Sequence, residues 1–161
     1  MRRLVIAVVV LALALSSGVT LGAEEQPSAS GAFRPAGSLG EARRHHTATL
    51  LPDGRVLVVG GAPGRPFDLT SAEVWDPATE SFGPAGVLAE PRWEHTATLL
   101  PDGRVLIVGG FGTERAGDTL QAEVWDPATE SFGPAGALAE GRFYHTATLL
   151  PDGRVLVVGG A

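Results

Sequence analysis

The stretch His46–Gly61 reads HTATLLPDGRVLVVGG, and it occurs three times in this chain of 161 residues. The second copy, His95–Gly110, differs only where Ile107 replaces Val58, and the third copy, His145–Gly160, is identical. Between these copies stands AEVWDPATESFGPAG, at Ala72–Gly86 and again, unchanged, at Ala122–Gly136. The three copies begin 49 and then 50 residues apart. The chain is therefore built from a repeated unit, and that unit decides its fold.

Each unit contains four short segments with the composition of β-strands. In the first unit they are His46–Leu51, Arg55–Val59, Ala72–Trp75 and a segment that starts at Ser81 and passes through Phe82. Pro52-Asp53-Gly54 and Asp76–Thr79 have the residues of tight turns, and Pro84 suits an outer edge strand. Four antiparallel strands in a period of about 50 residues predict an all-β protein made of propeller blades.

The complete pattern, R-x-x-H followed by PDGRVLVVGG and AEVWDPATESF, resembles the kelch repeat. The paired glycines of that family match Gly60-Gly61, Gly109-Gly110 and Gly159-Gly160. Its aromatic residue in the third strand matches Trp75 and Trp125, whereas Phe82 and Phe132 replace its usual Trp in the fourth. The resemblance covers residues 33–161 and implies the central-domain propeller of galactose oxidase-like proteins.

The sequence divides into a leader, a linker and the repeats. We predict a signal peptide over residues 1–23, a linker over 24–32, a leading outer strand over 33–45, a first blade over 46–94, a second blade over 95–144 and a partial third blade over 145–161. Two complete blades are fewer than the roughly 4–8 with which propellers close. The chain is thus expected to be a fragment, a short chain that closes the propeller by self-association, or a decayed gene product.

The leader has the composition of a secretory signal. Arg2 and Arg3 precede the apolar run Leu4–Leu15, and small residues follow up to Ala23. Cleavage after Gly22 or Ala23 would leave a secreted, periplasmic or cell-surface protein with no membrane segment. An uncleaved anchor is the alternative, because residues 4–23 are just long enough to span a bilayer. The Arg-only, Ala- and Gly-rich composition is typical of GC-rich bacterial genomes.

Composition excludes several kinds of chemistry. The sequence has no Cys, and all 12 basic residues are Arg, so thiol nucleophiles, disulfides and lysine Schiff bases are excluded. The formal net charge of −6 argues against a nucleic-acid partner. The copper site that galactose oxidase resemblance implies needs a Tyr–Cys crosslink, and this chain has Tyr144 but no Cys. We therefore expect no cofactor.

The copies differ mainly at one end of each unit, which we call the variable face. It comprises the loops between the second and third strands, 62–71 and 111–121, and the residue pair within each R-x-x-H link. The predicted binding residues are Arg44, His45, Trp93, Glu94, Phe143, Tyr144, Phe111 and Arg115. Different side chains on a fixed scaffold are typical of binding sites, although surface loops also drift without function.

The residues that recur in every link have a structural explanation. His46, His95 and His145 could converge on a metal, but a residue copied with its motif more often packs within the blade. Arg43, Arg92 and Arg142 are expected to bond carbonyls or carboxylates of a neighbouring blade. The recurrent carboxylates are expected to cap turns or to pair with these arginines, and they are Asp53, Asp102, Asp152, Glu73, Glu123, Asp76 and Asp126. No metal site is predicted.

The sequence contains no pair of carboxylates placed for acid–base catalysis, and we predict no catalytic residue. The leading hypothesis is an exported, noncatalytic module that binds a carbohydrate or a protein through the variable face. The alternative is a fragment of a secreted carbohydrate oxidase with its catalytic residues elsewhere. Whether the longer protein is an enzyme is left open, with a binding role favoured.

Overall fold

The computed structural model describes residues 33–64, 69–112 and 119–161. It divides into two units, Met1–Ser38 and Leu39–Ala161. Only residues 33–38 of the first unit are described, and all the named strands belong to the second. The predicted signal peptide and linker lie outside the described residues. Within the described part of the chain, no helix is long and apolar enough to cross a membrane.

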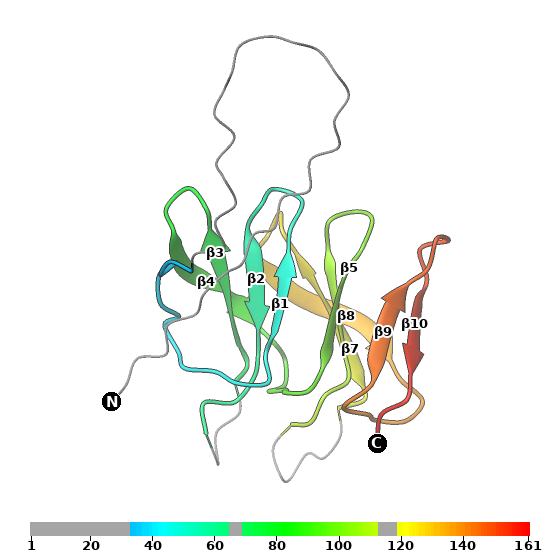
Figure 1. The fold of residues 1–161 in the computed structure, drawn as a ribbon. Helices are drawn as coiled ribbons and strands as arrows, with labels where there is room; N and C mark the ends of the chain where they lie inside the picture. The colour runs from blue at the N-terminus through cyan, green and yellow to red at the C-terminus, as the bar shows by residue number, and fades with distance from the viewer. Residues whose placement is uncertain (1–32, 65–68, 113–118) are drawn as a thin grey trace, which may run out of the picture. The chain divides into compact units, whose positions relative to one another are not determined.

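The repeats form two antiparallel four-stranded sheets and a hairpin (Figure 1). The first sheet contains β1 (Thr47–Leu50), β2 (Val56–Val59), β3 (Ser71–Asp76) and β4 (Ser81–Val87). The second contains β5 (Thr96–Leu99), β6 (Val105–Val108), β7 (Gln121–Asp126) and β8 (Ser131–Ala137), and the hairpin pairs β9 (Thr146–Leu149) with β10 (Val155–Val158). Strand order in both sheets follows the sequence, as predicted for blades.

The third and fourth strands of each sheet are longer than the sequence pattern predicts. Strand β4 continues to Val87 and passes through Pro84, which lies opposite Glu73. Proline is tolerated there because β4 is the outer strand, so one side of it has no ladder to maintain. The segment 33–45, predicted as a leading outer strand, contains no named strand. It pairs through isolated positions such as Arg44, opposite Ala62.

The turns form as predicted from Pro-Asp-Gly. In the first, the Gly54 amide donates to the Leu51 carbonyl at 3.0 Å, and Gly54 has a φ of 89°. Asp53 accepts from the Arg55 amide through one oxygen at 3.0 Å and from the Arg55 guanidinium through the other at 2.7 Å. The carboxylate therefore closes the turn and pairs its own cation, which leaves little charge for a ligand.

The hydrophobic core lies between the two sheets. Leu57, Val59 and Ala85 of the first sheet pack in one buried cluster with Ile107 and Trp125 of the second. The indole of Trp125 is fully buried, and its Nε1 donates to the Ala85 carbonyl at 2.9 Å. Each sheet therefore buries the face of its neighbour, as stacked blades must.

The innermost strands β1, β5 and β9 lie side by side. Histidines join them: Nε2 of His95 is 2.8 Å from the Thr47 hydroxyl, and Nε2 of His145 is 2.9 Å from the Thr96 hydroxyl. Burial lowers the pKa of His95 to about 3, with the positive charge of Arg92 as the second cause. The recurrent histidines therefore make neutral contacts between blades, as the packing interpretation predicts.

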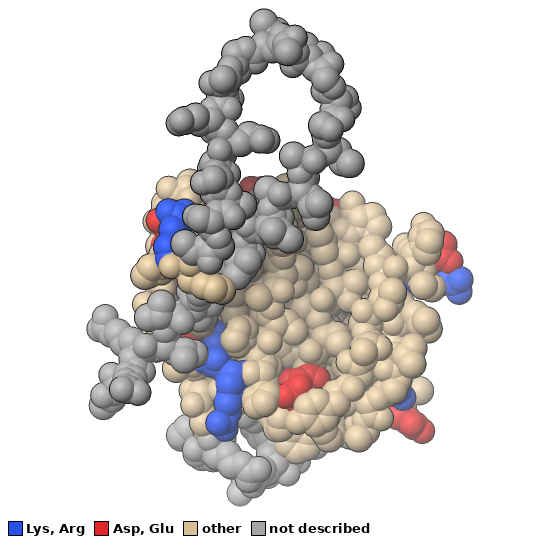
Figure 2. Space-filling view, viewed as in Figure 1, with Lys and Arg blue, Asp and Glu red and all other residues tan. Residues whose placement is uncertain are grey.

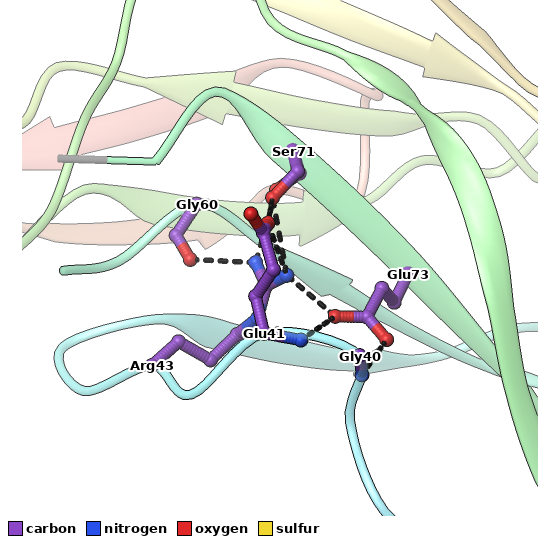
Figure 3. A network of polar contacts seen from close by, with 6 residues as sticks. All are labelled: Gly40, Glu41, Arg43, Gly60, Ser71 and Glu73. Atoms are coloured by element: carbon purple, nitrogen blue, oxygen red, sulfur yellow. Dashed lines mark hydrogen bonds and ion pairs between the residues drawn. The ribbon is translucent and has the colours of Figure 1, made fainter. Parts of the chain in front are cut away.

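The recurrent arginines join each link to the following blade (Figure 3). The Arg43 guanidinium donates to the carbonyls of Gly60 and Ser71 at 2.9 and 3.0 Å and to the Glu73 carboxylate at 2.6 Å. The other Glu73 oxygen accepts from the Gly40 amide at 2.7 Å. Ser71 in turn donates to Glu41. This network fixes the start of the link before it reaches the variable face.

In the second copy of the network the ion pair itself is buried, since both Arg92 and Glu123 are buried side chains. Arg92 donates to the carbonyls of Gly109 and Gln121 at 3.2 and 2.8 Å and to Glu123 at 2.7 Å, while Glu123 also accepts from the Ala89 amide at 2.9 Å. Arg92 has no exposed surface. The predicted role of the repeated arginines, bonds to a neighbouring blade, is therefore confirmed for this link.

Candidate functional site: the variable face

The four residues of each link have two separate roles. In the second link the outer two, Arg92 and His95, turn into the protein and are buried. The inner two, such as Trp93 and Glu94, are only partly covered. Because the outer pair fixes the backbone, the inner pair can vary without disturbing the blade. This explains why only the inner pair differs among the copies.

The first residue of each inner pair is held by a two-way backbone bridge. Trp93 and Phe111 exchange N–H···O bonds of 3.0 and 2.8 Å, and Arg44 and Ala62 exchange bonds of 3.0 and 2.9 Å. Phe143 and Ala161 do the same, with two bonds of 3.1 Å. These bridges place the links and the loops that follow the second strands at the same end of the blades, as predicted.

The second residue of each inner pair has left-handed backbone geometry. The φ angles of His45, Glu94 and Tyr144 are 57°, 55° and 56°. Three non-glycine residues in this region are uncommon, and such strain concentrates at functional sites. The conformation aims each amide at the preceding link: Glu94 donates to the His45 carbonyl and Tyr144 to the Glu94 carbonyl, each at 3.3 Å. The three links are thus hydrogen-bonded in series.

Five rings follow this series in continuous contact, and we call them the aromatic strip. They are His45, Trp93, Phe111, Phe143 and Tyr144, and the centroids of neighbouring rings are 5.4, 5.5, 5.6 and 5.1 Å apart in that order. The pairs are tilted or edge-to-face, the arrangements that aromatic rings prefer. The strip therefore crosses three links without a break.

Polar groups stand along the strip. The Nδ1 atom of His45 contacts the carboxylate of Glu94. Tyr144 is 61% exposed, and Arg44 is exposed beside the strip in the sequence. The face therefore combines aromatic rings with hydrogen-bond donors and acceptors, and it carries the positive charge of Arg44 and the negative charge of Glu94.

The structure brings together most of the predicted binding residues. Six of them form the aromatic strip or contact it: His45, Trp93, Phe111, Phe143 and Tyr144 are its rings, and Glu94 contacts His45. Arg44 pairs with Ala62 through its backbone, and Arg115 lies outside the described residues. The sequence could not reveal the left-handed geometry or the His45–Glu94 pair, since both depend on how neighbouring links meet.

A concavity of about 250 Å³ lies among the turns at the end of the strands opposite the variable face. It is lined by Arg55, Val74, Asp76, Thr79, Ser81, Phe82, Gly83, Pro84 and Glu130. Its cation, Arg55, already binds Asp53 at 2.7 Å and Glu130 at 2.6 Å. The repeat pattern does not predict this pocket, because Glu130 reaches it from the following blade.

Charges are sparse on the surface seen in Figure 2, which is mainly tan with separate blue and red patches. Nowhere in residues 33–64, 69–112 and 119–161 do three His, Asp or Glu side chains gather closely enough to hold a metal ion.

Comparison with solved structures identifies the architecture. A fungal alcohol oxidase of the AA5 family, solved in complex with copper, matches with a TM-score of 0.65 over 76% of this chain. The chain folds as blades of a β-propeller. Identity is 23%, and the match spans 29% of the oxidase chain, so the likeness is one of fold. No family model matches the sequence, and no curated protein sequence matches it.

The donor set of this chain does not fit a copper centre of the crosslinked kind that the sequence resemblance implies. The sequence has no Cys, and its one Tyr, Tyr144, lies in the aromatic strip rather than near a set of metal ligands. We therefore assign no step to copper in the described blades.

Proposed function

We propose that this chain is an exported, noncatalytic binding module whose ligand, a carbohydrate or a protein, contacts the variable face. The observation that carries this proposal is the aromatic strip, which spans three links whose backbones are held in left-handed geometry. Tyr144 and His45 are exposed and the other three rings are partly exposed, and aromatic residues at a surface are typical of sites that bind sugars and proteins. Export is supported by the composition of residues 1–23.

We also infer that the repeats are of kelch type. The paired glycines support this, because their geometry permits close approach of the links. A Cβ at Gly61 would lie 2.6 Å from the Arg44 carbonyl oxygen, and one at Gly110 would lie 2.9 Å from that of Trp93. Only residues without a Cβ allow this approach at a positive φ.

The binding role predicts that Trp93→Ala abolishes binding while the fold survives. A glycan array and a panel of exported proteins, both probed with residues 24–161, would identify ligands, and titration calorimetry would compare the variants. Phe33→Ala is the matched control, since Phe33 is a ring that is 69% exposed outside the strip. A Trp93→Ala variant with an unchanged circular dichroism spectrum and unchanged affinity would contradict the proposal.

The alternative function is that of a non-catalytic part of a larger alcohol or carbohydrate oxidase. The likeness of fold to the AA5 alcohol oxidase supports it. The intact mass of the native exported protein is the first measurement, because a mass far above 16.6 kDa would make this chain a fragment. Extra domains or a Tyr, Cys and His copper set in the remainder would then favour the oxidase, whereas more blades alone would favour the module.

A further inference from the structure

We propose that the ligand of the variable face is a neutral oligosaccharide that lies in extended form along the aromatic strip. This inference rests on the proposed binding function and specifies its ligand. It follows from three properties of the face: the shape of the strip, the backbone groups that are already used, and the charge of the polar groups beside it.

The shape of the strip favours a chain-like ligand. The rings follow one another singly from His45 to Tyr144, with each ring contacting the next. A protein hot spot is usually a compact cluster surrounded by a ring of residues that exclude water. A narrow row instead offers successive apolar surfaces to a ligand with successive units.

The backbone of the face argues against an extended peptide. Peptides are commonly bound by adding a strand to a free sheet edge through main-chain hydrogen bonds. Here the N–H and C=O groups of Trp93 and Phe143 are paired with Phe111 and Ala161, and the amides of Glu94 and Tyr144 are paired with the preceding links. Recognition must therefore come from side chains.

The side chains that remain match a sugar better than an apolar ligand. Each sugar ring has a C–H face that packs on an aromatic ring and hydroxyl groups that donate and accept hydrogen bonds. The Glu94 carboxylate supplies an acceptor, and the Tyr144 hydroxyl, on a residue 61% exposed, supplies both a donor and an acceptor. These groups lie on adjacent links, so they can meet adjacent sugar units.

The charge of the face favours a neutral sugar. The Arg43 and Arg92 guanidinium groups are directed inward to Glu73 and Glu123, so Arg44 is the exposed arginine of these two links. The whole chain carries a net charge of −6. An anionic sugar would meet one exposed arginine on these links and would be repelled by the chain's excess of carboxylates.

The test is a length series of neutral oligosaccharides, from monosaccharide to hexasaccharide, built from glucose, mannose, galactose or N-acetylglucosamine. Binding to residues 24–161 is measured by titration calorimetry, with oligogalacturonate as the anionic probe. We expect affinity to rise at least tenfold from disaccharide to hexasaccharide in one neutral series and to be at least tenfold weaker for the anionic oligomer. Equal affinity for the monosaccharide and hexasaccharide would overturn the extended arrangement.

Two variants place the ligand on the strip. Tyr144→Ala removes an exposed ring at one end and is expected to reduce hexasaccharide affinity at least tenfold, with little effect on the disaccharide. Phe33→Ala is expected to change neither. Equal loss for short and long oligosaccharides would contradict an extended ligand.

The outcomes separate this inference from the proposed function. If no neutral oligosaccharide binds, but a protein binds and loses affinity in both Trp93→Ala and Tyr144→Ala, the binding function stands and the sugar inference is wrong. If ligand binding is unchanged in both variants, the variable face is not the site and both proposals are wrong.

Discussion

The guanidinium of Arg92 illustrates how one side chain fixes the position of a site that it does not enter. It is fully buried, and it pairs with the carboxylate of Glu123 at 2.7 Å. Taking both charges out of water is costly, and only their mutual attraction and their additional hydrogen bonds offset that cost. Loss of one partner would leave the other as an unpaired buried charge.

We therefore expect Arg92→Met to lower the free energy of unfolding by about 3–5 kcal/mol, because Glu123 would lose its cation. Arg142→Met is the matched control in the third link. Arg142 donates to the Gly159 carbonyl at 2.8 Å, and its side chain is 29% exposed, so the expected loss is about 0.5–1.5 kcal/mol. Urea unfolding followed by circular dichroism measures both.

The double variant Arg92→Met/Glu123→Met tests the cause. If the unpaired charge produces the loss, replacing both charges with apolar groups should recover part of the stability. Equal destabilisation by Arg92→Met and Arg142→Met would contradict the importance of burial for this pair.

At the scale of the element, the glycine pair that ends the second strand of each blade decides how closely the next link can approach. Gly109 has a φ of 61°, and a Cβ there would lie 2.4 Å from the Arg142 carbonyl oxygen and 2.7 Å from the His145 ring. Gly159 has a similar φ of 73°, but no atom lies within 4 Å of the Cβ position. The two positions therefore share backbone geometry and differ in crowding.

This difference predicts unequal effects of the same substitution. Gly159→Ala should cost about 1–2 kcal/mol, the strain of a left-handed residue with a Cβ. Gly109→Ala should cost about 1–3 kcal/mol more, because the link must move away. Thermal unfolding of the two variants gives the comparison, and equal losses would show that the link yields without resistance.

At the scale of the whole molecule, the recurrent histidines of the links make stability depend on pH. Burial lowers the pKa of His46, His95 and His145 below the usual value of 6.5, and that of His95 falls to about 3. The unfolded chain binds these protons near pH 6.5, whereas folded His95 does not. The contribution is therefore complete above pH 6.5 and is lost as the pH falls towards 3.

As the pH falls from 6.5 towards 3, we expect His95 alone to lower the free energy of unfolding by about 1.4 kcal/mol for each pH unit. His95→Gln retains a group that can bond Thr47 but has no proton to titrate in this range. Urea unfolding at a series of pH values should show a shallower slope for His95→Gln. Parallel slopes for the two proteins would contradict the prediction, because they would mean that His95 binds protons equally in the folded and unfolded states.

Much of this fold is determined by the sequence because its signals are local. The turn at Pro52–Gly54 depends on residues that are adjacent in the chain. The strand pattern depends on a segment that occurs three times in the sequence. The candidate binding residues can also be predicted from the sequence, since the inner pair of each link differs among otherwise nearly identical copies. The ends of β4 were predicted less well, because Pro84 is acceptable only where a strand has a free edge.

Only the tertiary structure decides how one unit meets the next. Three contacts join residues whose pairing cannot be read from the repeat pattern. They are the ion pair between Arg92 and Glu123, the hydrogen bond between His95 and Thr47, and the ring contact between Trp93 and Phe111. The physical reason is that identical copies carry identical local preferences, so the sequence does not specify which copy each side chain contacts. Packing of one blade on the next makes that choice, and it thereby aligns separate rings into one strip.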